Sequence, residues 1–198
     1  FIRRALEPFA KITLDDPLKL IEGGASVIIL PDISAMTTQT LNTLENWVKE
    51  GGLLLRFAGP KMADATTGQF LLPVNLRAGG RSLSGSLSWD EPQTIDTFSE
   101  TSPFYGLDIP LDISISQQVL ADPAQDLEGK IWAQLSDGTP FITASGMDKG
   151  MVVLIHTTAN TEWSNFAISG LYVSVLKRII QLAGTSATQT SKVFSNLD

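Results

Sequence analysis

The sequence predicts an α/β domain in which helices cover both faces of a mainly parallel sheet. Two uninterrupted apolar runs, 26–30 and 53–57, are typical of strands that are buried on both faces of such a sheet. Between them, apolar residues recur at helical spacing at Leu41, Leu44, Trp47 and Val48. A right-handed crossover through this helix lays the second strand parallel to the first. The stretch 26–60 is therefore interpreted as one βαβ unit.

The same alternation of strand and helix continues on both sides of this unit. Residues 11–14 are expected to form a short strand, and a helix over Pro17–Glu22 follows, with a proline in its first turn. Far downstream, 151–156 is another fully apolar run that is expected to rejoin the central sheet. Alternation of this kind favours a parallel sheet with helices on both faces.

The domain is expected to be single and to cover residues 1–184. Its last helix has an apolar face and ends at Gly184, and Ser164 or Asn165 can cap its N-terminus. Residues 185–198 are rich in Ser, Thr and Gln, so we expect a flexible tail or linker there.

The middle third follows a different pattern, and we expect 68–128 to be a β-rich elaboration within the domain. Residues 82–89 alternate between apolar and polar side chains, as a half-exposed antiparallel strand does. The run 109–119 is expected to supply a second alternating strand. Asp137 and Gly138 then mark a tight hairpin between two further strands.

Composition and charge exclude several classes of function. The 198 residues carry 14 Lys and Arg against 21 Asp and Glu, a formal charge of -7 with scattered signs, which argues against a nucleic-acid partner. With no cysteine and one histidine, the chain excludes thiolate chemistry and multi-histidine sites, and we expect neither a metal nor a cofactor. No apolar run approaches the ~20 residues that span a bilayer. The chain begins at Phe1 without a signal peptide, so we interpret it as an excised or mature segment whose membrane anchor, if any, lies outside it.

Several short motifs resemble known protein families. The strand 28–31, the helix that ends in WVKEGG and the strand 53–59 resemble the βαβ unit of class I glutamine amidotransferase-like domains. Five further motifs follow one another along the chain: RFAGP at 56–60, LLPVNLR at 71–77, SPF at 102–104, DGTP at 137–140 and WSNFAISGL at 163–171. In this order they carry a closer resemblance, which extends up to Gly184, to the extracytoplasmic segment of large bacterial membrane proteins. Those proteins begin with a double-transmembrane region related to aerotolerance regulators of the BatA type.

The resemblance implies a flavodoxin-like, three-layer α/β/α body of the amidotransferase type. It implies that this body is held beside a bacterial inner membrane, on the periplasmic side, by helices that lie outside this sequence. The implied partners are other domains of the same membrane protein or a separate periplasmic protein. Contact with the membrane would be made only through the segments outside this sequence.

This sequence departs from the amidotransferase pattern at two catalytic positions. The nucleophile turn of those enzymes is Cys-Leu-Gly, and the matching tripeptide here is FAG at 57–59, so Phe57 stands at a vacant nucleophile position. Their late strand ends in His-Pro-Glu, and the match here is HTT at 156–158, which retains the histidine without the carboxylate that orients it. Because no base-activated nucleophile remains, we expect no enzyme activity.

Four residues are candidates for ligand contact: Asp32, His156, Glu162 and Ser164. Asp32 follows a buried strand at its carboxyl end, where open α/β sheets bind ligands, or it caps the following segment as a turn residue. His156 ends its own apolar strand and is either a lone acid or base near neutral pH or a satisfied strand-end residue. Glu162 and Ser164 lie in a loop expected to share that edge, and helix capping is the alternative role for Ser164.

Two weaker patterns concern the surface of the middle third. Asp90, Glu91 and Asp96 could bind a cation, but they lack the dense alternation of a calcium loop, so an acidic surface turn is favoured. An exposed Trp89 or Tyr105 would mark a contact surface, because large apolar patches on a soluble domain usually have that role.

Three hypotheses about function follow from these patterns. The leading one is a non-catalytic amidotransferase-like domain that serves ligand or protein recognition in a membrane-anchored bacterial protein. The second is a hydrolase in which His156 and Asp32 act with a Ser or Thr nucleophile. The third is a purely structural module, whose β-rich middle third packs on a neighbouring domain.

Overall fold

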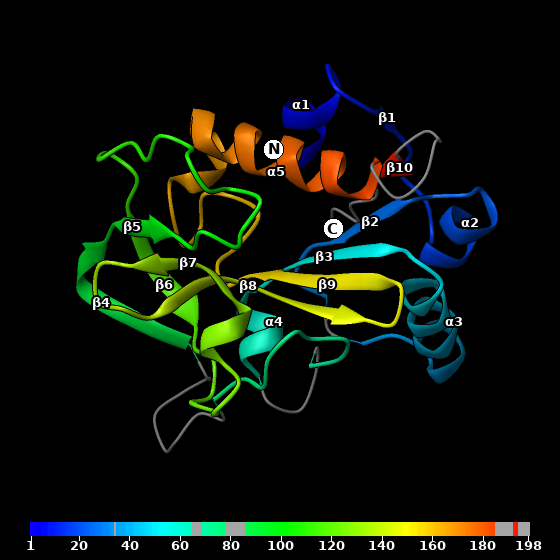
Figure 1. Ribbon diagram of the computed structural model, residues 1–198, viewed down its shortest axis with the longest axis horizontal. Coiled ribbons are helices and arrows are strands. Elements are labelled where there is room, and N and C mark those ends of the chain that lie inside the picture. The colour runs from blue at the N-terminus through cyan, green and yellow to red at the C-terminus, as the bar shows by residue number, and fades with distance from the viewer. Residues whose placement is uncertain (34, 65–68, 78–85, 185–191, 194–198) are drawn as a thin grey trace.

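The computed structural model has a mixed six-stranded sheet at its centre, with helices on both faces (Figure 1). It describes residues 1–33, 35–64, 69–77, 86–184 and 192–193. In spatial order, the strands of this sheet are β2 (Val27–Leu30), β3 (Leu53–Phe57), β9 (Gly150–Ile155), β8 (Pro140–Met147), β7 (Ile131–Leu135) and β5 (Ile95–Phe98). Two smaller pairs are β1 (Lys11–Ile12) with β10 (Lys192–Val193), and β4 (Ser86–Gln93) with β6 (Ile115–Val119). The helices are α1 (Ile2–Leu6), α2 (Pro17–Glu22), α3 (Thr38–Lys49), α4 (Pro60–Ala63) and α5 (Gly170–Gly184), with short 3-10 helices at Glu128–Lys130 and Phe166–Ile168.

The predicted βαβ unit is confirmed. Strands β2 and β3 pair in parallel, and every residue of both is buried. Helix α3 follows Thr37, whose hydroxyl accepts a hydrogen bond from the Thr40 amide at 3.2 Å. At the far end of the helix, the indole of Trp47 donates to the backbone oxygen of Ala25 at 3.0 Å. A Cβ on Gly52 would overlap the Trp47 ring, so this turn requires a glycine for the helix to close against the sheet.

The sheet is mixed rather than mainly parallel. β9 lies parallel to β3, but β8, β7 and β5 extend the sheet through antiparallel pairings. The connections between β7, β8 and β9 are tight turns at 136–139 and 148–149. Turns of this length cannot provide the crossover that parallel neighbours need, so these strands must run antiparallel.

Two further predictions about elements need correction. The strand expected over 109–119 is confined to β6, and the strand expected over 11–14 is confined to β1. β1 pairs in parallel with β10, which belongs to the segment 185–198 that was expected to be a flexible tail. The other residues of that segment lie outside the described part of the chain. Pairing between strands so distant in sequence leaves no local signal in either of them.

The last helix is capped by Ser169, and the prediction of Ser164 or Asn165 as its cap was wrong. The Ser169 hydroxyl accepts a hydrogen bond from the Tyr172 amide at 3.1 Å. Ser164 and Asn165 precede a separate 3-10 helix, so they come too early to reach the first turn of α5. The Asn165 side chain instead accepts a hydrogen bond from the Ser114 amide at 2.7 Å and donates one to the Asp112 backbone oxygen at 2.8 Å, both in the loop before β6.

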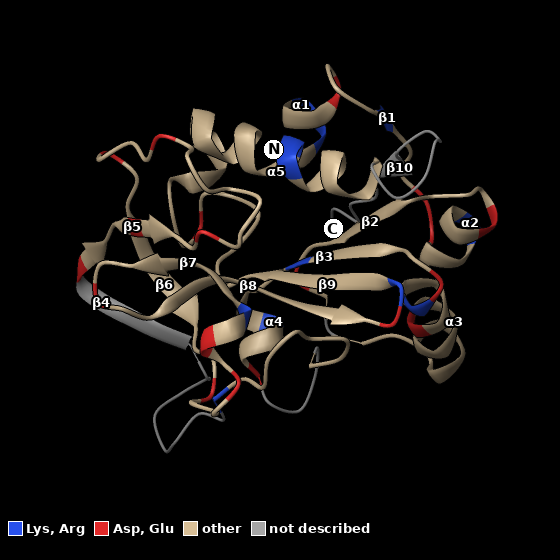
Figure 2. Cartoon of the chain, in the orientation of Figure 1, with Lys and Arg blue, Asp and Glu red and all other residues tan. Residues whose placement is uncertain are grey.

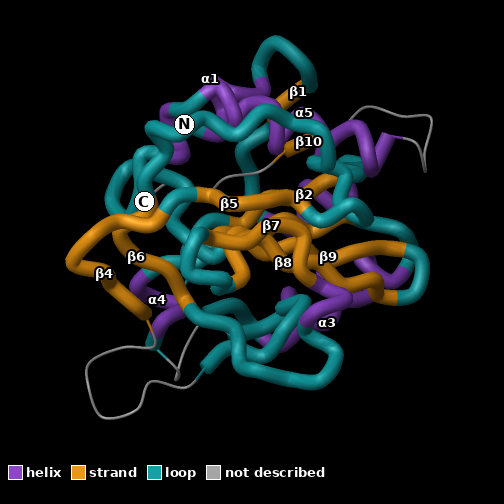
Figure 3. Tube along the Cα trace, turned by 60° about the vertical axis from the view of Figure 1, so that its left-hand side comes forward, coloured by secondary structure: helices purple, strands orange, loops and turns teal. Residues whose placement is uncertain are grey.

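Helices lie on both faces of the sheet (Figure 3), and an apolar core fills the space under each helical layer. α1 and α5 pack on one face, whereas α2 and α3 pack on the other. Side chains alternate along β3, so Leu55 and Phe57 belong to the core under α5, and Leu54 belongs to the core under α3. By the same alternation, the Arg56 side chain lies on the α3 face of the sheet, where it is fully buried.

Charged residues are spread over the surface without a single basic or acidic stripe (Figure 2). Ion pairs between residues four positions apart, each with at least one exposed side chain, include Arg3–Glu7, Lys19–Asp15, Lys49–Glu45 and Lys130–Asp126. Ion pairs at the surface contribute little to the free energy of folding. Within the described ranges, no helix combines the length and the apolar character needed to span a bilayer.

Candidate functional site

The carboxyl ends of the parallel strands β2, β3 and β9 meet at one edge of the sheet, where open α/β sheets bind ligands. From these three ends the chain continues to Asp32, to the turn at 58–59 and to His156. Two of the four predicted contact residues, Asp32 and His156, therefore leave the sheet at the same edge.

Asp32 connects the end of β2 to the turn that follows β3. Its carboxylate accepts hydrogen bonds from the backbone amides of Lys61 at 2.7 Å and Met62 at 2.9 Å, at the start of α4. A Cβ on Gly59 would lie 2.5 Å from the Asp32 carboxylate oxygen, so only glycine allows this approach. Asp32 is thus a capping residue, but it caps a helix that is remote in sequence rather than the segment that follows it.

Arg56 is the feature of this edge that the sequence interpretation did not single out. It is the one charged residue in the apolar strand LLLRF, and that interruption is the signal that could have identified it. Its side chain is fully buried. The guanidinium carbon lies 4.1 Å from the centre of the Phe70 ring, and Nη1 donates a hydrogen bond to the Phe70 backbone oxygen.

The charge of Arg56 is only partly compensated. Burial lowers the pKa of Arg56 from 12.5 to about 9, and the nearby negative charge of Asp32 opposes that shift. No ion pair links Arg56 to Asp32 or to any other residue that the structure describes. Nε and Nη2 are buried and have no hydrogen-bond partner among those residues. Buried donors without partners cost about 1–3 kcal/mol each, so Arg56 reduces the stability of the domain unless something else binds it.

His156 is a satisfied strand-end residue, as one of the two interpretations proposed. Its Nδ1 lies 2.7 Å from the backbone oxygen of Val119, and its Nε2 lies 2.9 Å from the Thr143 hydroxyl. A carbonyl can only accept, so Nδ1 carries the proton and Nε2 accepts the hydrogen bond from Thr143. Burial lowers the pKa of His156 from 6.5 to about 4, and the bond to Val119 opposes this shift only in part. The imidazole is therefore neutral near pH 7 and joins β6 to β9.

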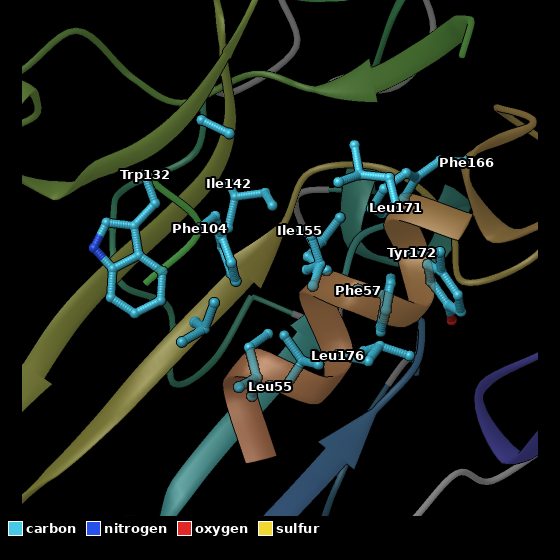
Figure 4. Close-up of a cluster of buried hydrophobic side chains, with 14 of the residues drawn as sticks. Leu55, Phe57, Phe104, Trp132, Ile142, Ile155, Phe166, Leu171, Tyr172 and Leu176 are labelled. Carbon is cyan, nitrogen blue, oxygen red and sulfur yellow. The ribbon is translucent and has the colours of Figure 1, made fainter. Parts of the chain in front are cut away.

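Phe57 ends β3 and lies in the core under α5 (Figure 4). Its ring is fully buried, with its centre 6.1 Å from that of Tyr172. The Tyr172 ring in turn packs edge-on against Phe166 at 5.2 Å. The chain bends after Phe57 and enters α4 at Pro60, so the strand-to-helix turn is present and its first side chain serves packing.

Glu162 and Ser164 do not join the other two candidates. Glu162 is exposed, whereas Ser164 is buried and forms an isolated β-bridge with Ile115. The Ser164 hydroxyl has no hydrogen-bond partner in the described part of the chain. Across the residues described, no hydrogen bond or ion pair connects any two of Asp32, His156, Glu162 and Ser164.

The weaker surface patterns have mixed outcomes. The side chains of Trp89 and Asp90 lie outside the described residues, and no group of three or more carboxylates and histidines suited to a metal exists among those that are described. Tyr105 is exposed, as are Leu111 and Ile168. A pocket of about 380 Å³ is lined by residues of the segment 69–76, including Phe70. This pocket and the Arg56 guanidinium therefore share the Phe70 side chain.

No protein-family model matches this chain, and no curated protein matches it. Among solved structures, the chain is similar to the Cytoplasmic Protein STM3548 from Salmonella typhimurium, with a TM-score of 0.63 and 15% identity over 86% of this chain and 75% of that chain. It is also similar to the Cytoplasmic Protein STM1381 from Salmonella typhimurium LT2, with a TM-score of 0.60 and 14% identity over 96% of this chain and 86% of that chain.

A third similar structure is the beta-galactosidase from Bacillus circulans sp. alkalophilus. Its TM-score is 0.52 at 14% identity, and the match covers 96% of this chain but 26% of the enzyme. At such identities the likeness concerns the fold alone. The chain is a mixed α/β domain. The same fold makes up most of the STM1381 chain and about a quarter of the beta-galactosidase chain.

Proposed function

We propose that this chain is a non-catalytic α/β domain with a flavodoxin-like, three-layer body of the class I glutamine amidotransferase type, and that it serves ligand or protein recognition. The observation that carries the proposal is the environment of His156. Its side chain is fully buried, and both ring nitrogens are within hydrogen-bond distance of a partner. A histidine in this state holds two strands together and has no free nitrogen for a substrate proton.

The vacant nucleophile position supports the same proposal. The bend after β3 corresponds in sequence to the nucleophile turn of the enzymes, but the Phe57 ring belongs to the core that also contains Tyr172 and Phe166. A phenyl ring cannot attack an amide or an ester. The edge of the sheet retains polar groups suited to recognition, namely the buried Arg56 and the Asp32 carboxylate.

We further propose that the domain belongs to a membrane-anchored bacterial protein of the inner membrane and faces the periplasm. This part of the proposal depends on the ordered motifs that resemble such proteins, from RFAGP at 56–60 to WSNFAISGL at 163–171. Its partners would be other domains of that protein or a periplasmic protein. Reporter fusions in the full-length protein test the location: alkaline phosphatase joined after residue 184 should be active, and a cytoplasmic reporter at the same point should be inactive.

Assays of glutamine and p-nitrophenyl acetate hydrolysis test the absence of catalysis. We expect the chain to produce no turnover above that of a denatured sample. The matched variants are His156→Asn and Thr143→Val, which remove the two sides of one buried hydrogen bond. Turnover by the wild-type chain that both variants abolish would refute a non-catalytic role.

The hydrolase hypothesis has one specific observation in its favour. The Thr143 hydroxyl and His156 Nε2 lie 2.9 Å apart, which is the distance of a nucleophile from its general base. Asp32 forms no hydrogen bond with this pair, because its carboxylate binds the start of α4. A hydrolase that uses this pair would therefore keep its turnover after Asp32→Asn and lose it after Thr143→Val.

The structural-module hypothesis is favoured by the apolar side chains at the surface. Leu111 is 91% exposed and Ile168 is 67% exposed, which suits contact with a neighbouring domain. If this is the only role, Leu111→Ser and Ile168→Ser should weaken binding to the adjoining domain. The same two changes should leave small-molecule binding at the sheet edge unaltered, whereas the recognition hypothesis places that binding at Arg56.

A further inference from the structure

The feature of the molecule that remains unexplained is the buried guanidinium of Arg56. It lies near the carboxyl end of β3 and is fully buried, and within the described part of the chain it makes one hydrogen bond and one ring contact, both to Phe70. Arginine carries five N–H donors. A buried arginine that serves only structure normally pairs with a carboxylate, and no such pair is present for Arg56 among the described residues.

The two nitrogens without a partner are a matched pair. The hydrogen bond to Phe70 uses Nη1, and the unpartnered atoms are Nε and Nη2. In a planar guanidinium, the N–H of Nε and one N–H of Nη2 point in the same direction along one edge. This edge is the fork that binds two oxygens of one carboxylate in parallel hydrogen bonds. The free donors of Arg56 therefore form one two-pronged binding group.

Asp32 does not occupy this fork. Its charge is near enough to favour the charged form of Arg56, but its two oxygens accept hydrogen bonds from the amides of Lys61 and Met62. Gly59 keeps the Asp32 carboxylate against the start of α4, because its missing Cβ leaves the space that the carboxylate fills. Asp32 thus reduces the local positive charge without using the two donors.

The charge balance limits the class of ligand. The nearby Asp32 carboxylate already offsets part of the charge of Arg56. A ligand with a single negative charge therefore adds less uncompensated charge to this poorly hydrated site than a dianion does. A carboxylate has one charge and two coplanar oxygens, and so matches both the charge and the fork. A phosphate monoester matches the fork but carries more charge than the site compensates.

We propose that Arg56 is the anchor of a binding site for a small carboxylate at the edge of the sheet, reached past the half-buried ring of Phe70. This inference rests on the recognition role proposed above and assigns the class of ligand to it. Phe70 contacts the guanidinium and also lines the pocket of about 380 Å³ along 69–76, so a hollow large enough for a small organic acid lies on the other side of this one ring.

Binding to the whole chain tests the inference. The probes are acetate and succinate, with phosphate and chloride at equal ionic strength as the comparison, and the readouts are the ¹⁵N-¹H signal of Arg56 Nε and the midpoint of thermal unfolding. We expect the carboxylates to shift the Nε signal and to raise the midpoint, and we expect phosphate and chloride to do neither. A larger shift with phosphate than with acetate would overturn the assignment to carboxylates.

Two matched variants show whether the fork is responsible. Arg56→Lys keeps the positive charge and removes the fork, and we expect it to weaken acetate binding by about tenfold or more. Arg178→Lys makes the same change at an exposed arginine that hydrogen-bonds the Pro103 backbone, and it should leave binding unchanged. Equal effects of the two changes, or no shift of the Nε signal in the wild-type chain, would overturn the inference.

The outcome is independent of the test for catalysis. Hydrolysis of glutamine together with acetate binding at Arg56 would refute the non-catalytic role and leave the carboxylate site standing. Absence of both activities would refute the carboxylate site and leave a non-catalytic, protein-binding role standing.

Discussion

Nδ1 of His156 lies 2.7 Å from the backbone oxygen of Val119, and the Val119 amide donates in return to the His156 backbone oxygen at 2.9 Å. The only histidine of the chain therefore holds β6, a strand of a separate small sheet, against the end of β9. Because the imidazole is buried at this contact, the packing of the β-rich middle third on the central sheet is most stable when His156 is neutral.

Stability should fall as the pH is lowered through the titration range of His156. The folded pKa is about 4 and the ordinary value is 6.5. The unfolded chain thus binds a proton that the folded chain excludes, so the stabilisation is complete above pH 6.5 and is lost as the pH falls towards 4. Between pH 7 and pH 5 the loss should be about 2 kcal/mol. Urea unfolding at the two pH values measures it.

The matched control for this prediction is His156→Gln. The variant removes the titrating group and keeps a side chain that can hydrogen-bond, so its free energy of unfolding should change much less between the same two pH values. An unchanged pH dependence in the variant would show that other groups cause the effect.

Gly59→Ala should destabilise the domain by displacing Asp32. The new Cβ would lie 2.5 Å from the Asp32 carboxylate oxygen, and the carboxylate would have to leave the amides of α4. The φ of Gly59 is 176°, which any residue adopts, so the effect is steric rather than conformational. We expect a loss of about 1–2 kcal/mol in the free energy of unfolding, measured in urea.

Two comparisons make this prediction specific. Gly129→Ala adds a Cβ with no atom within 4 Å, and it should change stability by no more than about 0.5 kcal/mol. In the background of Asp32→Ala, the cost of Gly59→Ala should largely disappear, because the clashing carboxylate is gone. Additive costs in the double variant would contradict the proposed contact.

Gly150→Ala should be among the most damaging single-methyl changes in the chain. A Cβ at this position would overlap the backbone oxygens of Val48 and Gly52, where the end of α3 meets the start of β9. Backbone oxygens cannot rotate away as side chains do, so the strand itself must move. We expect a loss of about 3 kcal/mol or more. Gly146→Ala, on the preceding strand with no atom within 4 Å of the added Cβ, is the control.

Arg56→Met should leave the isolated domain as stable as the wild-type chain, or more stable by up to about 1 kcal/mol. The change removes a buried charge whose Nε and Nη2 have no partner among the described residues, and it places an apolar chain of similar length in the core. Guanidinium chloride unfolding in the absence of carboxylates measures the difference. A loss of several kcal/mol would show that Arg56 is retained for structure and would contradict a binding site at its guanidinium.

Local patterns in the sequence predicted the elements that depend on neighbouring residues. The apolar runs at 26–30 and 53–57 become β2 and β3, and the Asp137-Gly138 hairpin joins β7 to β8. The strand at 11–14 and the tail at 185–198 were predicted separately, and nothing local indicated that β1 and β10 pair. The hairpin also predicted that β7 and β8 run antiparallel to each other. The sequence analysis missed that both strands belong to the central sheet, which they make mixed.

The candidate site divides in the same way. The sequence placed Asp32 and His156 at strand ends, because strand ends follow from local pattern. One of its two interpretations of His156, a satisfied strand-end residue, is the role that the structure shows. The sequence did not show which atoms those side chains bind. The Asp32 carboxylate accepts hydrogen bonds from amides that lie about thirty positions further along the chain. The sequence did not identify Arg56 as a site residue, because the role of a single cation in a strand depends on its burial and on its partners.

By itself, the sequence determined which segments become buried strands and helices, since apolar periodicity and turn residues act over a few positions. It also determined that no thiol or pair of histidines is available for chemistry. Only the tertiary structure decided that the single histidine is buried with a partner at each ring nitrogen, and that a guanidinium is buried with one edge that no described residue contacts by a hydrogen bond. Burial and partnership arise from contacts between distant parts of the chain, and these exist only once the sheet and its two helical faces have assembled.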